Sequence, residues 1–176
     1  SGFLDMRLSP EEPLTAYEVV NRRSERELTS HLREFGEERH AALIAHAIVT
    51  AREKHSIDRA DELARIIEEA VPPRYARMKI HPATRTFQAL RIVVNDELGA
   101  LSEGLRGAWA ILSKGGAISV ISFHSLEDRI VKRFMKDMCA LGEGRLVMKK
   151  PVRPTREEID INPKSRSARL RAIKKI

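Results

Sequence analysis

The fold is decided by residues 114–126, which read KGGAISVISFHSL. Two glycines form a turn, and residues 117–123 are rich in the β-branched and apolar types that are typical of a buried, parallel-type strand. Ser125 is placed to cap a helix over 126–138, whose first turn carries acidic residues that complement the helix dipole. A strand that leads directly into a capped helix, after a long helical stretch, predicts an α/β fold.

The sheet that this strand implies is incomplete within the sequence. Two late strands are expected near 146–149 and 168–174, on either side of a short helix at 155–161. A buried parallel-type strand needs neighbours on both sides, and three strands make only a small sheet. We therefore expect further strands to come from residues that precede Ser1 or from another chain.

Residues 13–80 are predicted to be entirely helical. A capping box opens one helix at Ser24, and apolar residues at helical spacing follow until Gly36 stops it. A second helix is expected over 37–54, and a third begins near Asp58 and ends before a pair of prolines. Short connections between these helices indicate a compact helical module.

A basic linker joins this module to a long helical stretch over 83–112. Gly99, Gly104 and Gly107 interrupt that stretch. Because glycine weakens a helix interior, we expect two helices or a bend at these glycines.

The composition excludes several classes of protein. Of the 176 residues, 42% are hydrophobic, 32% charged and 5% aromatic, which is typical of one globular domain or two small ones. A single cysteine, Cys139, excludes an internal disulfide and fits a reducing compartment. No apolar run approaches the roughly 18 residues that a membrane span needs, and residues 1–14 do not resemble a signal peptide. We therefore expect a soluble, cytoplasmic protein with no membrane partner.

Positive charge is concentrated at the C-terminal end. Residues 145–176 hold eleven basic and three acidic side chains, whereas the whole chain carries a net charge of +7. The preceding sequence is therefore close to neutral. Such a segment forms either a solvated surface or a phosphate-binding one. Its basic residues alternate with apolar residues, which favours ordered strands.

Three clusters of polar side chains are candidates for a functional site. The first spans 81–91, where one predicted helix face carries Arg85, Gln88 and Arg91. Two arginines beside threonine hydroxyls at a helix start can hold a phosphate or a ribose. An ordinary amphipathic helix has the same pattern, so both interpretations stay open.

The second cluster lies where the predicted strand ends. Ligands of open α/β sheets bind beyond the carboxyl ends of the strands, which places His124 and Ser125 at a favourable rim. A purely structural histidine is the competing interpretation, and Ser125 lacks the Gly-x-Ser-x-Gly elbow of a nucleophile.

The third cluster lies just before and within the last predicted strand and comprises Arg166, Arg169 and Arg171. These arginines form either a phosphate-facing surface or a solvated strand edge. The remaining histidines lack ligand spacing, so no metal site is predicted.

Several short motifs occur in the order that one known family shows. They are FLDMR at 3–7, FGEER at 35–39, HPATRTFQALR at 81–91, NDEL at 95–98, SFHSLEDRIVK at 122–132 and PKSRSARL at 163–170. In these motifs, and over essentially its whole length, the chain resembles the bacterial 16S ribosomal RNA cytosine-N4 methyltransferase family. Phe3 stands where family members commonly have a proline.

This resemblance implies a class I methyltransferase that uses S-adenosylmethionine, with a helical domain inserted into a Rossmann-like sheet. The family's Gly-rich cofactor loop and acidic ribose-binding residue are absent from this sequence. The expected domains are 1–12 as the end of an N-terminal methyltransferase half, 13–80 as the inserted helical substrate-recognition domain, and 81–176 as the C-terminal part of the Rossmann-like domain. We expect the chain alone to be inactive, and either a homodimer or a complementing N-terminal half to complete the sheet.

The implied activity is methylation of the exocyclic N4 amine of a cytosine in small-subunit ribosomal RNA, which requires the base to be positioned and turned out of its stack. Asp5, His124 and Ser125 are then expected at the rim of the base pocket. The residues expected to bind the RNA substrate are Arg85, Gln88, Arg91, Arg166 and Arg169.

Two other functions fit parts of the sequence. A non-catalytic module that binds RNA or the ribosome needs only the basic segment. A hydrolase that pairs His124 with Asp128 is a weaker alternative, because no nucleophile elbow or metal set accompanies the two residues.

Overall fold

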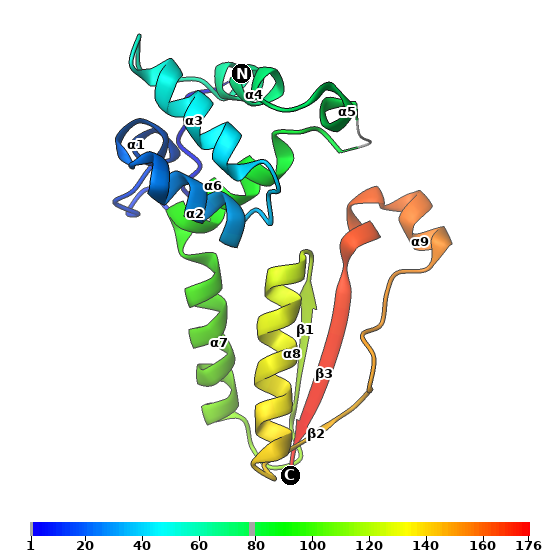
Figure 1. Ribbon diagram of the computed structural model, residues 1–176. Helices are drawn as coiled ribbons and strands as arrows, with labels where there is room; N and C mark the ends of the chain where they lie inside the picture. Colours follow the sequence, from blue (N-terminus) through cyan, green and yellow to red (C-terminus); the bar gives the residue numbers. More distant parts are fainter. Residues whose placement is uncertain (1, 78–79) are drawn as a thin grey trace. The chain divides into compact units, whose positions relative to one another are not determined.

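The computed structural model describes residues 2–77 and 80–176 and divides into two compact units, Ser1–Glu97 and Leu98–Ile176 (Figure 1). The first unit is helical and the second contains the sheet. None of the helices in the described ranges is long and apolar enough to cross a membrane.

The first unit is built from short helices that local sequence signals begin and end. They are α1 (Ala16–Arg22), α2 (Glu25–Glu34), α3 (Ala41–Arg52), α4 (Ala60–Ala70), α5 (Pro73–Ala76) and α6 (Thr84–Asn95). Ser24 caps α2 in the predicted capping box, because its hydroxyl accepts from the backbone of Glu27 and the Glu27 carboxylate accepts in return. Thr15 and Glu18 form the same arrangement at α1.

Apolar stripes on these helices meet in one core. Leu28 and Leu32 of α2 pack with Ile44 and Ile48 of α3, as the helical spacing predicts. Helix α6 contributes Leu90 and other buried residues to the same core. The compact helical unit therefore extends beyond residue 80 and includes α6, while the expected domain division at 80 stays a prediction about a longer protein.

Two predicted boundaries in this unit are wrong. The second helix begins at Ala41 rather than near 37, because Glu37 adopts a left-handed backbone conformation with φ of 48°. The long helical stretch breaks at Asp96, which has φ of 43°, and not at a glycine. Helix α7 (Glu97–Ile111) then runs through all three glycines without interruption.

The second unit is a three-stranded sheet with α8 (Ser125–Ala140) packed against it (Figure 1). Its strands are β1 (Ala117–Ser122), β2 (Gly144–Leu146) and β3 (Arg169–Lys175), in the order β1-β3-β2. The segment before β3 holds α9 (Arg156–Ile161) and a 3-10 helix (Pro163–Ser167). Trp109, Val131, Met135 and Ile173 form part of the core of this unit. The mixed α/β class is thus confirmed.

Strand β1 differs from its prediction as a buried, parallel-type strand. It pairs antiparallel with β3, from Ala117 opposite Lys174 to Ser122 opposite Arg169. Residues 117–121 alternate between exposed and half-buried, with Ile121 58% exposed, and only Ser122 at the end of the strand is buried. Although its composition is apolar, β1 is therefore not buried on both sides, because it has only one neighbouring strand among the described residues.

Candidate functional site

The junction between β1 and α8 is organised by His124. Its Nδ1 atom accepts a hydrogen bond from the backbone N–H of Glu127 at 3.3 Å. One carboxylate oxygen of Glu127 accepts from the backbone N–H groups of Phe123 at 2.8 Å and of His124 at 3.2 Å. The N-cap is therefore His124, and the prediction that Ser125 caps the helix is wrong, since Ser125 is the first residue of α8.

The cap determines which proton the His124 ring carries. Because Nδ1 accepts a hydrogen bond, the neutral ring carries its proton on Nε2. Nε2 has no hydrogen-bond partner and lies 3.4 Å from Oε1 of Glu127. The side chain is 12% exposed, so this atom is a nearly enclosed donor at the end of the strand. A His-x-x-Glu spacing, like the Ser-x-x-Glu box, was the sequence signal for this arrangement.

A second charged cluster ties α8 to β3. The Asp128 carboxylate accepts from Nε and Nη2 of Arg171, at 2.7 and 3.1 Å, and from Nη1 of Arg169, at 2.8 Å. Bonds from Arg171 and then Arg169 hold the pKa of the Asp128 carboxyl below its ordinary value of 3.8, although burial opposes them. Both carboxylate oxygens are engaged by guanidinium groups, which opposes a hydrolytic pair of Asp128 with His124.

Asp5 lies in the first unit, in the segment that precedes α1. Arg7 donates to both of its carboxylate oxygens, from Nε at 2.8 Å and from Nη2 at 3.0 Å. These bonds lower the pKa of the Asp5 carboxyl, so it stays ionised at neutral pH. Asn95 fixes the same segment, since its side chain bonds the Met6 carbonyl at 3.0 Å and the Leu8 N–H at 2.7 Å. Sequence reasoning did not identify Arg7 as the partner of Asp5.

The polar residues of α6 have partners within the first unit. Arg85 donates to the Glu37 carbonyl at 2.6 Å, and Gln88 donates to the Phe35 carbonyl at 3.0 Å. Arg91 forms an ion pair with Glu97 at 2.6 Å. Arg85 and Gln88 thus hold the connection between α2 and α3 against α6.

Arg166 and Arg169 occupy different environments in the second unit. Arg169 belongs to the cluster around Asp128 and is 35% exposed. Arg166, in the 3-10 helix, is exposed. Its side chain forms no hydrogen bond or ion pair among the described residues.

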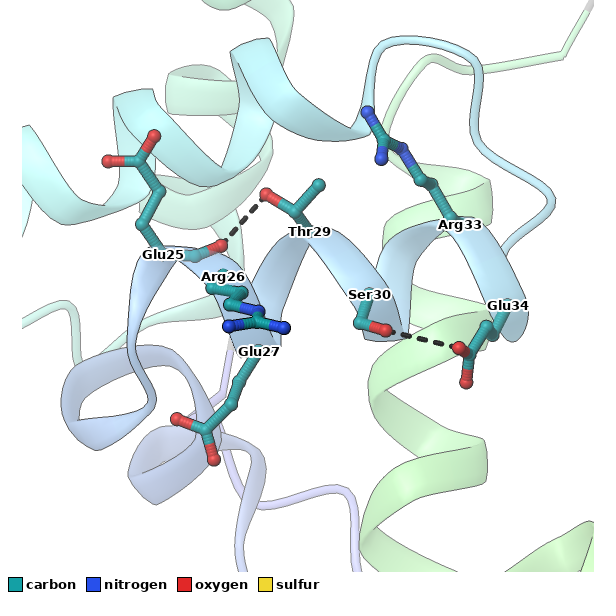
Figure 2. A pocket seen from close by; sticks show the side chains of 7 residues that line it. All are labelled: Glu25, Arg26, Glu27, Thr29, Ser30, Arg33 and Glu34. Carbon is teal, nitrogen blue, oxygen red and sulfur yellow. Dashed lines mark hydrogen bonds between the residues drawn. The ribbon is translucent and has the colours of Figure 1, made fainter.

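A hollow on the outer face of α2 has the character of an ordinary solvated surface. Figure 2 shows the side chains that line it, all of which come from that one helix. Their charges are mixed, and two of them bond within the helix, Thr29 to the Glu25 carbonyl and Ser30 to Glu34. A face of this kind offers no set of side chains that converges on a ligand.

The fold and these clusters define a mixed α/β protein with a histidine-capped strand–helix junction and a basic last strand. The chain belongs to the MraW methylase family, whose sequence profile matches residues 1–176.

Three relatives carry the same printed name, ribosomal RNA small subunit methyltransferase H. The chain is 49% identical to the Persephonella marina protein, 51% to the Neorickettsia sennetsu protein and 49% to the Methylococcus capsulatus protein. These alignments cover 98%, 99% and 99% of this chain, but only 59%, 58% and 62% of the relatives. The chain therefore spans about three fifths of the length of the curated relatives that it matches.

Proposed function

We propose that this chain is part of an S-adenosylmethionine-dependent methyltransferase that modifies the N4 amine of a cytosine in 16S ribosomal RNA. The observation that carries the proposal is the similarity of nearly the whole chain to proteins named as small-subunit ribosomal RNA methyltransferases. The substrate would be the RNA of the small ribosomal subunit, in the cytoplasm. The choice of cytosine N4 rests on the resemblance of the motifs around Asp5, Arg85 and His124.

The methyl donor is expected to bind mainly outside this chain. The donor supplies an activated methyl group, and its amino-acid and ribose parts need a backbone loop and an acidic side chain. The described hollows do not provide that set, since the one between α7 and α8 combines Asp137 with two arginines and apolar side chains. The open edge of β1 supports a complementing N-terminal half, or a second copy of the chain, that completes the sheet.

His124 is proposed to lie at the rim of the base pocket, where its buried Nε2 would donate to the base only after the side chain has turned outward. Cytosine offers two acceptors, N3 and O2, on the same edge as its exocyclic amine. A neutral imidazole whose Nδ1 is already an acceptor donates to such an atom and does not remove the amine proton. Ser125, at the first position of α8, is proposed to line the same rim.

Asp5 is proposed as an acceptor for the amine hydrogens. Its lowered pKa makes it a weak base, so it orients the amine and leaves proton removal to another group.

RNA binding is proposed for the residues predicted from the sequence. Arg85, Arg91 and Arg169 each use part of a guanidinium group within the protein, which fixes the orientation of the rest. Gln88 supports Arg85 by holding the same connection. Arg166 has all its donors available to a phosphate.

The test measures transfer of a labelled methyl group to unmodified small subunits by the complete gene product, followed by mass analysis of the nucleosides. We expect N4-methylcytidine. His124→Ala removes both the cap and the imidazole, whereas His124→Asn restores a favoured capping residue without the imidazole. Both variants are expected to lose more than about tenfold in activity, in line with the loss of one positioned donor.

Full activity of His124→Asn would show that His124 only caps α8. Tight RNA binding by the complete gene product without methyl transfer would contradict the enzyme proposal and favour a non-catalytic RNA-binding module.

A further inference from the structure

A small basic hollow lies in the second unit, beside α8, β2 and β3. Its floor is apolar and its rim is cationic. The floor consists of Met135, Leu146, Met148 and Ala172, and the rim consists of Lys132, Lys136, Lys149 and Arg171. Its volume is about 40 Å³, room for roughly three water molecules. The cationic rim suits a compact anionic group such as a phosphate.

The rim charges are available to a ligand. Lys132, Lys136 and Lys149 are exposed, and their side chains form no hydrogen bond or ion pair within the described part of the chain. Within the described residues, Nη1 of Arg171 forms no hydrogen bond, because Asp128 binds only Nε and Nη2. The described side chains that line the hollow include no acidic one.

The cationic groups of the rim repel one another when no anion lies between them. Lys132 and Lys136 are four residues apart on α8, a spacing at which like charges repel. The apolar floor lowers the local dielectric constant and thereby strengthens the field of the rim charges. Arg171 adds a guanidinium that its bond to Asp128 holds in one orientation, so little side-chain entropy is lost when it binds a ligand.

We propose that this hollow binds one backbone phosphate of the RNA substrate, through Lys132, Lys136, Lys149 and Arg171. The proposal rests on the proposed function for the identity of the RNA. A phosphate contact of this kind fixes the position of the RNA and does not read its sequence. It adds lysines of α8 and of the segment after β2 to a surface that sequence analysis had assigned to arginines.

The test uses the 176-residue chain and a fluorescently labelled single-stranded oligouridine, with binding followed by anisotropy at several salt concentrations. The triple variant Lys132→Gln, Lys136→Gln, Lys149→Gln is expected to bind about tenfold more weakly, as the loss of three exposed charge contacts implies. The salt dependence of log K should decrease by about 0.7 for the one phosphate that is lost.

A matched control removes the same charge elsewhere. Lys54, Lys114 and Lys174 are exposed and lie outside the hollow, so their triple change to Gln is expected to alter binding less than about twofold. Replacing the three rim lysines with Arg should retain binding, and unchanged circular dichroism would show that the variants fold.

Equal weakening by both triple variants would overturn the proposal, because net charge alone would then explain binding. A polyglutamate peptide that competes as well as the RNA would also overturn it and indicate an acidic protein partner. The RNA assay involves no methyl transfer, so a failed methylation experiment and a failed phosphate site remain distinguishable.

Discussion

The carboxylate of Asp128 is expected to contribute substantially to the stability of the second unit, and Asp128→Asn tests this contribution. The substitution keeps the side-chain shape but leaves the guanidinium groups of Arg169 and Arg171 without their anion. The Asp128 side chain is 8% exposed and that of Arg171 is 14% exposed, so water replaces the lost bonds poorly. Arg169, at 35%, recovers more hydration.

Removing one partner of a buried ion pair costs about 3–5 kcal/mol. Because Arg169 is partly exposed, we expect Asp128→Asn to lower the free energy of unfolding by about 3 kcal/mol, at the lower end of this range. Trp109 is the single tryptophan of the chain and lies in the core of this unit. Its fluorescence in a urea titration therefore reports the unfolding of this unit, and the midpoint should fall by about 2 M.

The stabilisation by the Asp128 carboxylate should decrease as the pH falls. The pKa of the Asp128 carboxyl is lowered in the folded state, so its stabilisation is complete above about pH 4–5 and is lost as the pH falls through the folded-state value. The difference between the wild-type protein and Asp128→Asn should therefore shrink in acid.

The control is Asp137→Asn, an exposed acid in the last turn of the same helix, with an expected change within about 0.5 kcal/mol. The reasoning would be refuted if Asp128→Asn changed the free energy of unfolding as little as Asp137→Asn does. It would also be refuted if the difference between the wild-type protein and Asp128→Asn were the same at pH 2 as at neutral pH.

Three further outcomes are expected. Gly36→Ala should destabilise the first unit by about 2 kcal/mol, measured by thermal unfolding in circular dichroism, because the new Cβ would lie 2.7 Å from the carbonyl oxygens of Leu32 and Arg85. Tyr75→Phe should cost about 1–2 kcal/mol, since the Tyr75 hydroxyl bonds the buried Glu38 carboxylate at 2.6 Å. Burial and that bond raise the pKa of Tyr75 to about 12, so the advantage of the wild-type protein should be present below pH 10 and vanish as the pH rises toward 12. Calorimetry should detect little or no S-adenosylmethionine binding to the 176-residue chain, and micromolar affinity would contradict the proposal that the methyl donor binds mainly outside this chain.

The helices of the first unit could be predicted because their ends are set by nearby residues. Ser24 and Glu27 are three positions apart, and the prolines after α4 act on the chain next to them. The start of α3 could not be predicted, since it depends on the left-handed conformation of Glu37. That residue is held from α6 by a bond from Arg85 to its carbonyl, 48 positions along the chain. Gly36 follows the end of α2 as predicted, and the absence of a Cβ there permits the close approach of the Arg85 backbone.

The environment of β1 could not be predicted because a strand's composition does not identify its partners. The pattern from Ala117 to Ser122 favours burial on both faces, and it correctly located the strand and the helix that follows. Burial depends on strands and helices that cover the two faces, and these are determined by distant sequence. The pairing with β3 joins residues about 50 positions apart, which local periodicity does not encode.

The candidate site shows the same division between local and distant information. The positions of the basic residues were visible in the sequence, but their internal partners were not. Arg85 bonds a carbonyl, Arg91 bonds Glu97, and Arg169 bonds Asp128. A planar guanidinium group with several fixed donors suits such internal bonds, whereas a hydrated lysine ammonium is more easily left at the surface.

This difference between arginine and lysine explains why the basic hollow escaped sequence analysis. The three clusters predicted from the sequence contain arginines, and none of them includes Lys132 or Lys136. Their significance depends on Lys149 and Arg171, which come from a later loop and strand and complete the rim only after folding. A charge cluster assembled from three segments has no signature in any one of them. The RNA binding proposed for this chain should accordingly depend more on these lysines than on the arginines already bonded within the protein.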